Sequence, residues 1–311
     1  MSLSFLSNIF IALLLLGLSS GNSIAQENCS SNIQTDSLKK AESSLNEDCA
    51  PIGEWQFGLS LGIGLRSNPL LDGDDIPLIV LPTVSYYGEN FFINNLDMGY
   101  TIVDEKNWTV NLLTTPGLDN VFFERWDIGN FFVDIGTNNS AGLDSGDANL
   151  GTTNQEDRLT EVSAFDLNTR KLSWLAGIET QYQTSSGDLW QLSVLQDISD
   201  VHQGKEIRFA WATPISNSNW NATLGFTWKD QKTTNYYFGL AEDEITDDRA
   251  AYTAKSSFNP FVRLSWRESI ENDSPWRFSI EYQKLGDAIN DSPILNEGHT
   301  ISFFVGKQFD F

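Results

Sequence analysis

The sequence predicts an all-β protein: a closed, antiparallel transmembrane β-barrel of about twelve strands that follows an N-terminal polar tail. Long segments alternate apolar and polar residues with a period of two, as strands with one lipid-facing side do. Their apolar faces begin or end with Trp, Tyr or Phe, which are enriched at membrane interfaces. The chain has one long apolar run, at its start, and a mean hydropathy of −0.26, which argues against membrane-spanning helices.

The composition argues against several classes of function. Its 42 acidic and 19 basic residues give a formal charge of −23, so no basic surplus is available to replace counterions on nucleic acid. Two Met, two His and two Cys leave little material for a thiol or transition-metal enzyme. We therefore expect no nucleic-acid partner, no cofactor and no bound metal.

Residues 1–25 are predicted to be a signal peptide. The apolar stretch Ile9–Leu16 is followed by Ser23-Ile24-Ala25, a small-x-small cleavage site that makes Gln26 the first mature residue. No Lys or Arg precedes the apolar stretch, so the α-amino group alone supplies positive charge. The alternative is a buried N-terminal helix, which is disfavoured because nothing amphipathic follows.

Residues 26–53 are predicted to be a polar periplasmic tail. The segment is rich in Ser, Asn and Glu and has too little apolar content to pack alone. Cys29 and Cys49 flank it, and an oxidising periplasm would allow a disulfide between them. The sequence leaves that disulfide open.

Residues 54–311 are predicted to form the barrel. In the first segment the odd positions from Trp55 to Leu65 are apolar, whereas the even positions from Gln56 to Gly64 are small or polar. A soluble sandwich is the alternative, but its strands are usually about five or six residues long. Strands in hydrocarbon must close on themselves so that every backbone group is paired. The predicted strands are 54–65, 77–88, 91–103, 107–116, 173–184, 188–198, 204–214, 219–230, 233–240, 257–268, 275–286 and 299–311.

One connection conflicts with this strand order. Strict up-and-down counting places the segment 117–172 on the periplasmic side, where connections are normally short. Either the segment contains a further strand pair, at Asn130–Ile135 and Thr160–Asn168, or the parity of the strands is wrong. The count is therefore open by two strands.

Candidate catalytic residues are few. His202 lies near Asp197 and Asp200, whereas His299 begins the last strand without a nearby Ser nucleophile. A barrel hydrolase would need a His beside a nucleophile or paired acids. We interpret His202 as a turn residue whose Asp neighbours accept backbone hydrogen bonds, and we predict no catalytic residues.

Two acidic loops resemble calcium sites in composition only. They are Asp72-Gly73-Asp74-Asp75 and Glu242-Asp243-Glu244 with Asp247-Asp248. Carboxylate oxygens suit calcium, but the spacing of a dedicated calcium loop is absent. We interpret both loops as a solvated acidic rim.

Four arginines occur within the predicted strands. A charge on the lipid face would cost about 2–4 kcal/mol at the bilayer midplane. We therefore expect these side chains to point into the lumen and to pair with Glu268 or Glu281. The four are Arg66, Arg263, Arg267 and Arg277.

Short motifs along the chain carry a family resemblance. They are Tyr236-Tyr237-Phe238-Gly239 followed by Tyr252, Leu285-Gly286-Asp287-Ala288, Asp291-Ser292-Pro293-Ile294, Asp197–Gly204, and Asn68-Pro69 with Gly73 and Pro77 through Pro82 to Tyr86. With these motifs the chain resembles the MipA/OmpV outer-membrane proteins over most of 54–311. The Cys-bearing tail and the acidic stretch 137–157, which looks like an insertion, depart from the family.

The resemblance implies an outer-membrane protein without enzymatic activity. It implies a scaffold that links a lytic transglycosylase and a murein synthase, or a surface adhesin, surrounded by outer-membrane lipid and lipopolysaccharide. Phe311, two residues after Phe309, resembles the C-terminal signature that the barrel assembly machinery recognises. A small-solute channel is the alternative function, and a hydrolase using His202 is a more remote one.

Overall fold

The computed structural model describes residues 52–123, 128–130, 167–216, 218–244, 251–269 and 274–311. The predicted signal peptide, nearly all of the polar tail, Cys29, Cys49 and the acidic stretch 137–157 lie outside the described residues. The chain divides into two compact units, Met1–Cys49 with Asp104–Lys106, and Ala50–Val103 with Asn107–Phe311. The barrel belongs to the second unit, apart from Asp104 and Glu105.

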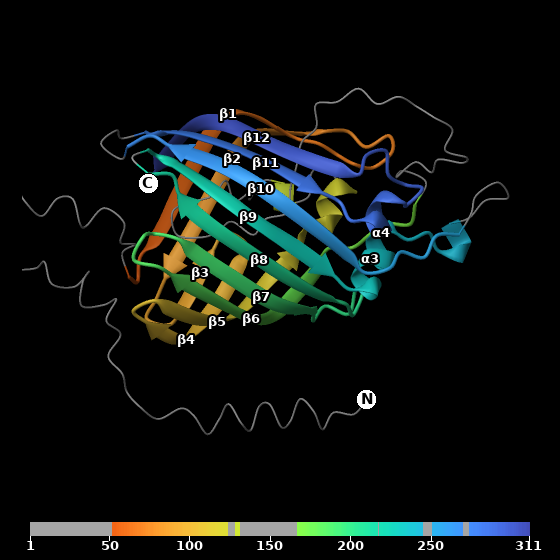
Figure 1. The fold of residues 1–311 in the computed structure, drawn as a ribbon, viewed down its shortest axis with the longest axis horizontal. Coiled ribbons are helices and arrows are strands. Elements are labelled where there is room, and N and C mark those ends of the chain that lie inside the picture. The colour runs from red at the N-terminus through yellow and green to blue at the C-terminus, as the bar shows by residue number, and fades with distance from the viewer. Residues whose placement is uncertain (1–51, 124–127, 131–166, 217, 245–250, 270–273) are drawn as a thin grey trace, which may run out of the picture. The chain divides into compact units, whose positions relative to one another are not determined.

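Within the described residues, twelve strands close into one barrel in which sequence neighbours are also neighbours in space (Figure 1). β1 pairs antiparallel with β12 and closes the ring, with Gly62 opposite Gly306. The strands are β1 (Trp55–Arg66), β2 (Ile76–Tyr87), β3 (Phe91–Asn94), β4 (Asp97–Glu105), β5 (Trp108–Gly117), β6 (Ser173–Gln183), β7 (Leu189–Asp197), β8 (Lys205–Pro214), β9 (Trp220–Lys229), β10 (Ser257–Arg267), β11 (Trp276–Lys284) and β12 (His299–Asp310). The prediction of a closed antiparallel barrel is confirmed.

The two ends of the barrel differ in their connections. The N–H of Phe311 donates to the carbonyl oxygen of Phe57 at 2.8 Å. The start of β1 and the end of β12 therefore lie at the same end of the barrel, which we call the terminal end. Four of the five connections there have two to five residues, and 268–275 has eight. The described parts of the connections 67–75, 118–172, 198–204, 230–256 and 285–298, most of which are longer, lie at the opposite end, which we call the loop end.

The strands expose mainly apolar side chains outward, whereas their inward faces bury most of the polar ones together with apolar clusters such as Leu113, Leu175 and Leu195. In β7, Leu192 and Val194 are exposed, whereas the intervening Gln191 and Ser193 are buried. Val194 is in register with Ile178 of β6, which is in turn in register with Leu112 of β5. Neighbouring strands therefore present a continuous apolar outer surface, as the period-two pattern predicted.

The predicted strand 91–103 is two strands, and this corrects the parity. β3 ends at Asn94 and β4 begins at Asp97, with Asn95 in the turn at a φ of 54°. The N–H of Asn95 donates to the carbonyl oxygen of Val84 at 2.7 Å, and the Asn95 Oδ1 accepts from the N–H of Val84 at 3.1 Å. Because of this extra hairpin, β5 runs toward the loop end, so the long segment after it joins the other long connections.

The predicted strand 233–240 is wrong, because the helix α3 (Gln231–Phe238) occupies these residues. Asp230 caps the helix, with its Oδ1 accepting from the N–H of Thr233 at 3.0 Å. Tyr237 and Phe238 are buried on this helix rather than alternating across a sheet. The missed hairpin and the false strand cancel, which is why the predicted count of twelve agrees with the structure.

Short helical segments accompany α3. They are η1 (Leu118–Phe122), η2 (Ile128–Asn130), η4 (Glu242–Glu244) and α4 (Asp287–Asn290). In the described part of the chain, no helix combines the length and the apolar character that crossing a membrane requires.

Candidate functional site

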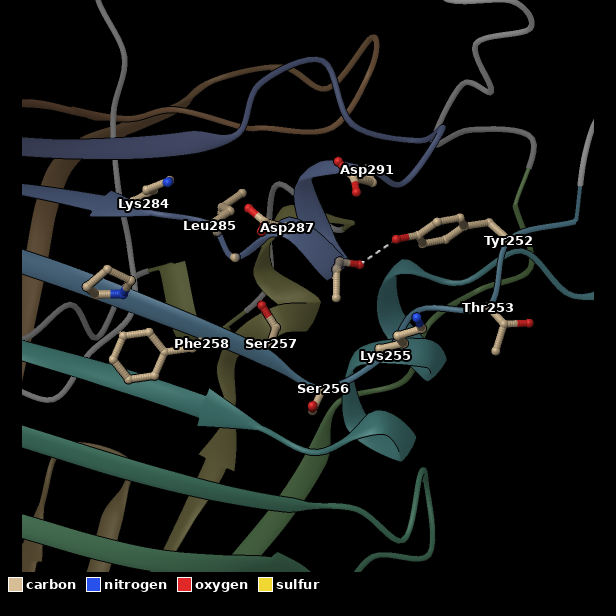
Figure 2. A pocket seen from close by; sticks show the side chains of 13 residues that line it. Tyr252, Thr253, Lys255, Ser256, Ser257, Phe258, Lys284, Leu285, Asp287 and Asp291 are labelled. Atoms are coloured by element: carbon tan, nitrogen blue, oxygen red, sulfur yellow. Dashed lines mark hydrogen bonds between the residues drawn. The ribbon is translucent and has the colours of Figure 1, made fainter.

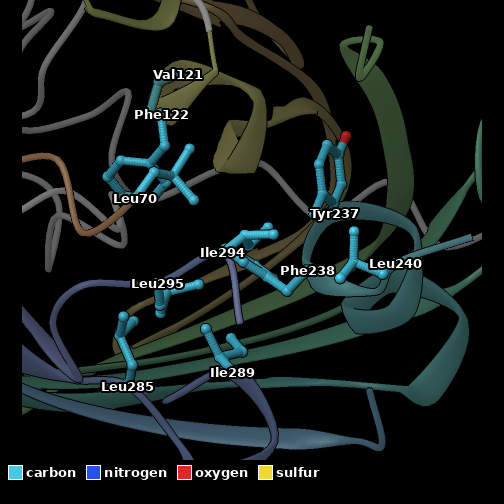
Figure 3. Close-up of a cluster of buried hydrophobic side chains, with 10 residues drawn as sticks. All are labelled: Leu70, Val121, Phe122, Tyr237, Phe238, Leu240, Leu285, Ile289, Ile294 and Leu295. Carbon is cyan, nitrogen blue, oxygen red and sulfur yellow. The ribbon is translucent and has the colours of Figure 1, made fainter. Parts of the chain in front are cut away.

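A core of buried apolar side chains at the loop end brings together the segments that carry the family resemblance (Figure 3). The Oγ of Ser292 donates to the carbonyl oxygen of Phe238 at 2.6 Å, which ties the segment after α4 to the end of α3. The N–H of Leu71 donates to the carbonyl oxygen of Ile294 at 2.8 Å. We call this cluster the loop-end core; it consists of Leu70, Val121, Phe122, Tyr237, Phe238, Leu240, Leu285, Ile289, Ile294 and Leu295.

Asn68 fixes the first loop of the barrel against this core. Its Nδ2 donates to the carbonyl oxygen of Phe122 at 2.7 Å, and its Oδ1 accepts from the N–H of Leu70 at 3.1 Å. A Cβ atom at Gly73 would lie only 2.5 Å from the Asn68 Cγ, so the loop needs glycine there. The N–H of Asn68 donates to Asp75 Oδ1 at 3.1 Å, so one carboxylate of the acidic loop closes the loop itself.

His202 lies in a buried polar cluster at the loop end. Its Nε2 lies 3.1 Å from the Oγ of Ser173, the first residue of β6. Its Nδ1 accepts from the N–H of Gly204 at 2.9 Å. The hydroxyl of Tyr237 also lies 3.2 Å from the Ser173 Oγ. The cluster therefore joins β6, the loop before β8 and α3.

The direction of these hydrogen bonds decides what the imidazole can do. A backbone N–H can only donate, so Nδ1 is the acceptor and the proton of the neutral ring sits on Nε2, pointing at Ser173. A general base would need an unprotonated nitrogen facing that hydroxyl. Burial lowers the pKa of His202, although the charge of Asp197 acts in the opposite direction, so the ring is held neutral.

One of the two aspartates near His202 accepts backbone hydrogen bonds as predicted. Asp197 Oδ2 accepts from the N–H groups of His202 and Gln203, both at 2.8 Å. Asp200 Oδ1 instead accepts from the side chain of Gln203 at 2.5 Å. The interpretation of His202 as a turn residue with backbone-satisfied Asp neighbours is confirmed for Asp197. His299 lies elsewhere, with its ring 5.6 Å from that of Tyr282.

The second acidic segment is only partly the solvated rim that was predicted. Glu244 is buried and its Oε1 lies 2.8 Å from Arg170 Nη1. The carboxylate also accepts from the N–H groups of Asn168 and Ala241, both at 2.9 Å. Burial alone would raise the pKa of Glu244, but these hydrogen bonds and the Arg170 charge lower it. Asp247 and Asp248 lie outside the described residues.

Among the residues that the structure describes, no three His, Cys, Asp or Glu side chains gather so that they could hold a metal ion. Three carboxylates of the two acidic segments accept hydrogen bonds from neighbouring donors, namely Asp75, Asp243 and Glu244. The aspartates of the first segment, Asp72, Asp74 and Asp75, are exposed, as expected of a solvated acidic rim.

The arginines predicted to face the lumen do so. Arg263 pairs with Glu281, with 2.5 Å between Nη2 and Oε2. Arg66 is buried and its Nη1 donates to Asn130 Oδ1 at 3.2 Å. Arg267 is in register with Arg277, so two like charges face each other near the terminal end. Glu268, the other expected partner, accepts from the N–H of Trp276 at 3.0 Å.

Other buried charged groups were not singled out from the sequence. Glu179 accepts four side-chain hydrogen bonds, including one from Gln191 at 2.7 Å. Arg208 pairs with Glu206 at 2.5 Å, and Lys229 pairs with Asp119 of η1. Glu179, Glu206, Arg208 and Lys229 all lie in predicted strands, where alternation indicates that they point inward. Asp119 carries no such signal, because it lies outside any periodic segment.

A closed antiparallel barrel with an apolar outer surface and a charged, hydrogen-bonded interior is an outer-membrane β-barrel. The chain belongs to the MipA family, since the family model described as "MltA-interacting protein MipA" matches residues 59–311. The outer membrane is accordingly its location. Long loops of bacterial barrels face the cell exterior and short turns face the periplasm, so the loop end is extracellular.

Comparison with individual proteins gives distant relatives. The MltA-interacting protein of Escherichia coli (strain K12) is 23% identical over 261 residues, which cover 83% of this chain and 91% of the relative. The outer membrane protein YiaT of the same strain is 21% identical over 258 residues, covering 81% and 91%. Among solved structures, an outer-membrane channel from Pseudomonas putida F1 aligns over 85% of this chain and 97% of the other, with 8% identity and a TM-score of 0.37.

Proposed function

We propose that this barrel is a non-enzymatic scaffold of the outer membrane that binds a lytic transglycosylase on its periplasmic side and, through it, a murein synthase. The observation that carries the proposal is the match to a relative named MltA-interacting protein over 91% of that relative's length. A binding function needs no catalytic residues. The His202 cluster agrees with this, because its proton points toward the serine rather than away from it.

The terminal end offers a surface for such a partner. The register of β3 with β4 ends at the pair Phe91 and Tyr100, so the β4–β5 hairpin continues beyond β3. Ile102 and Val103 are consecutive residues on opposite faces of β4, yet both are exposed, at 44% and 37%. Trp108 at the start of β5 is exposed as well. Exposed apolar side chains on a protruding hairpin are suited to binding a protein partner.

Pull-down from detergent tests the proposal. The full-length barrel is immobilised and incubated with the purified lytic transglycosylase of the same bacterium. We expect retention by the native barrel, weakened by Val103→Asp and unchanged by Ile198→Asp, a control in a loop at the opposite end. Failure of the native barrel to retain the enzyme would overturn the proposal.

A small-solute channel is distinguished by conductance in planar bilayers. The loop-end core supports a scaffold, because several loops pack their apolar side chains together at that end. We expect no steady open current from the reconstituted protein, whereas a steady current would favour the channel.

Assembly of the barrel is proposed to use its C-terminal residue. Phe311 has 81% of its surface exposed and follows the last residue of β12 directly. An accessible terminal aromatic supports recognition by the barrel assembly machinery. Phe311→Ala is expected to lower the amount of heat-modifiable protein in the outer membrane, and an unchanged amount would contradict this role.

A further inference from the structure

A pocket of about 710 Å³ opens at the loop end, where β10 begins and β11 ends (Figure 2). Phe258, Pro260 and Lys284 line it from the outward side of these strands, because the intervening Asn259 and Gln283 are buried on the inward side. Lys255 lines it from the segment just before β10. The pocket therefore lies on the membrane-facing side of the wall, near the extracellular interface.

The outer surface next to the pocket is apolar. Moving along the strands toward the terminal end, the outward residues are Val262 on β10 and Tyr282 and Ile280 on β11. Val262 and Tyr282 are in register, and all three side chains are exposed. Tyr is a typical residue of the membrane interface. A lysine-bearing pocket thus lies next to an apolar surface, which matches the division of a lipid into headgroup and acyl chains.

The pocket is also lined by two carboxylates, those of Asp287 and Asp291. With Lys255 and Lys284 they give a formal charge of zero. A phosphate would be attracted by the lysines and repelled by the aspartates, unless a divalent cation bridges carboxylate and phosphate oxygens, both of which are ligands that hard cations prefer. The donor set therefore suits a phosphorylated headgroup that is bound together with a divalent cation.

We propose that this pocket binds lipopolysaccharide, the phosphorylated glycolipid of the outer leaflet. Lys255 and Lys284 contact the phosphates of its lipid A part, a divalent cation joins these phosphates to the aspartates, and acyl chains lie along Val262 and Ile280. The extracellular position of the loop end selects the outer-leaflet glycolipid over phospholipids of the inner leaflet. The site is independent of the proposed scaffold function, since it lies at the opposite end of the barrel.

Lipid retention in purified protein tests the site. Full-length protein is reconstituted in phosphatidylcholine nanodiscs that contain diphosphoryl lipid A or, in a second arm, phosphatidylglycerol, with calcium present. After washing in detergent, the retained lipid is measured by mass spectrometry. The test variant is Lys255→Ala with Lys284→Ala. The matched control is Lys171→Ala with Lys232→Ala, which removes two exposed lysines that do not line the pocket.

We expect the native protein and the control to retain lipid A, and the pocket variant to retain about thirtyfold less, since each of the two lysines contributes about 1 kcal/mol at a membrane surface. Chelation of calcium should give a comparable loss. Heat-modifiability on a gel verifies that every variant is folded. Equal retention by the native protein and the pocket variant would overturn the site, and so would equal retention of phosphatidylglycerol and lipid A by the native protein.

Discussion

Arg263 and Glu281 face each other in register across β10 and β11, with 2.5 Å between Arg263 Nη2 and Glu281 Oε2. Both side chains are buried on the lumen side of the wall. Desolvating two charges is costly, and their mutual attraction offsets the cost only while both partners are present. The pair therefore fixes the register of two adjacent strands more than it adds net stability.

Removing one partner of this pair should destabilise the barrel strongly. Glu281→Gln is expected to lower the free energy of unfolding by about 3 kcal/mol, because the buried guanidinium loses its charge partner. Urea unfolding in lipid vesicles, followed by tryptophan fluorescence, measures the change. The double variant Arg263→Gln with Glu281→Gln should recover part of the loss. A single variant as stable as the native protein would contradict the pairing argument.

The exposed apolar side chains of the strands should be in contact with lipid. Ile178 lies at the centre of β6 and is 46% exposed, whereas Ile198 lies in a loop and is 63% exposed. Ile178→Lys is expected to cost about 2–4 kcal/mol, as a lysine does near the bilayer midplane. Ile198→Lys should change stability by less than about 0.5 kcal/mol. Equal effects in vesicle unfolding would mean that the two positions meet the same solvent.

Much of the wall could be predicted from the sequence because alternation reports directly which face meets lipid. The prediction from alternation failed where a short hairpin interrupts a period-two segment. The pair Asn94-Asn95 favours a turn, but the alternation on either side of it is continuous enough to suggest one strand. It also failed at α3, where aromatic and β-branched residues favour a strand and the burial of Tyr237 in the loop-end core decides for a helix.

The candidate site could be predicted only in part, for a similar reason. The inward direction of Arg66 and Arg263 follows from strand parity and from the cost of a charge in lipid. Arg66 donates to Asn130, which lies in η2, and Lys229 pairs with Asp119, which lies in η1. These segments have no periodic pattern, so nothing local in the sequence indicates which strand they approach.

The β3–β4 turn should depend on asparagine for two separable reasons. Asn95 has a positive φ of 54° and its side chain accepts from the N–H of Val84. Asn95→Ala is expected to lower the free energy of unfolding by about 1–2 kcal/mol, through backbone strain and the lost hydrogen bond. Asn95→Gly should cost less, since glycine adopts a positive φ readily. Vesicle unfolding of both variants checks this order, and the reverse order would contradict it.

Acidification should loosen the loop end in two stages. The pKa of His202 is lowered from 6.5 by burial, so its contribution to stability is complete above that pH and is lost as the pH falls below it. The pKa of Glu244 is lowered from 4.5, so its contribution is lost only at lower pH, as the carboxylate takes up a proton. Hydrogen exchange of the loop-end segments at decreasing pH measures both stages. His202→Asn should remove the first stage and leave the second; an unchanged first stage would exclude His202 as its source.

The Ser173–His202 contact should contribute to stability and leave any hydrolysis unchanged. Ser173→Ala removes the hydrogen-bond partner of the buried Nε2 proton, and we expect a loss of about 1–3 kcal/mol in vesicle unfolding. His202→Ala should likewise destabilise the loop end. Neither variant should differ from native protein when phospholipid or peptide hydrolysis is assayed at a temperature where all three remain folded. Ser199→Ala serves as the control, because its hydroxyl lies in the same loop and donates to Asp197 rather than to the His202 ring. A hydrolytic activity present in native protein and control but abolished by Ser173→Ala would show that the imidazole adopts the other tautomer in solution, and the non-enzymatic assignment would then be wrong.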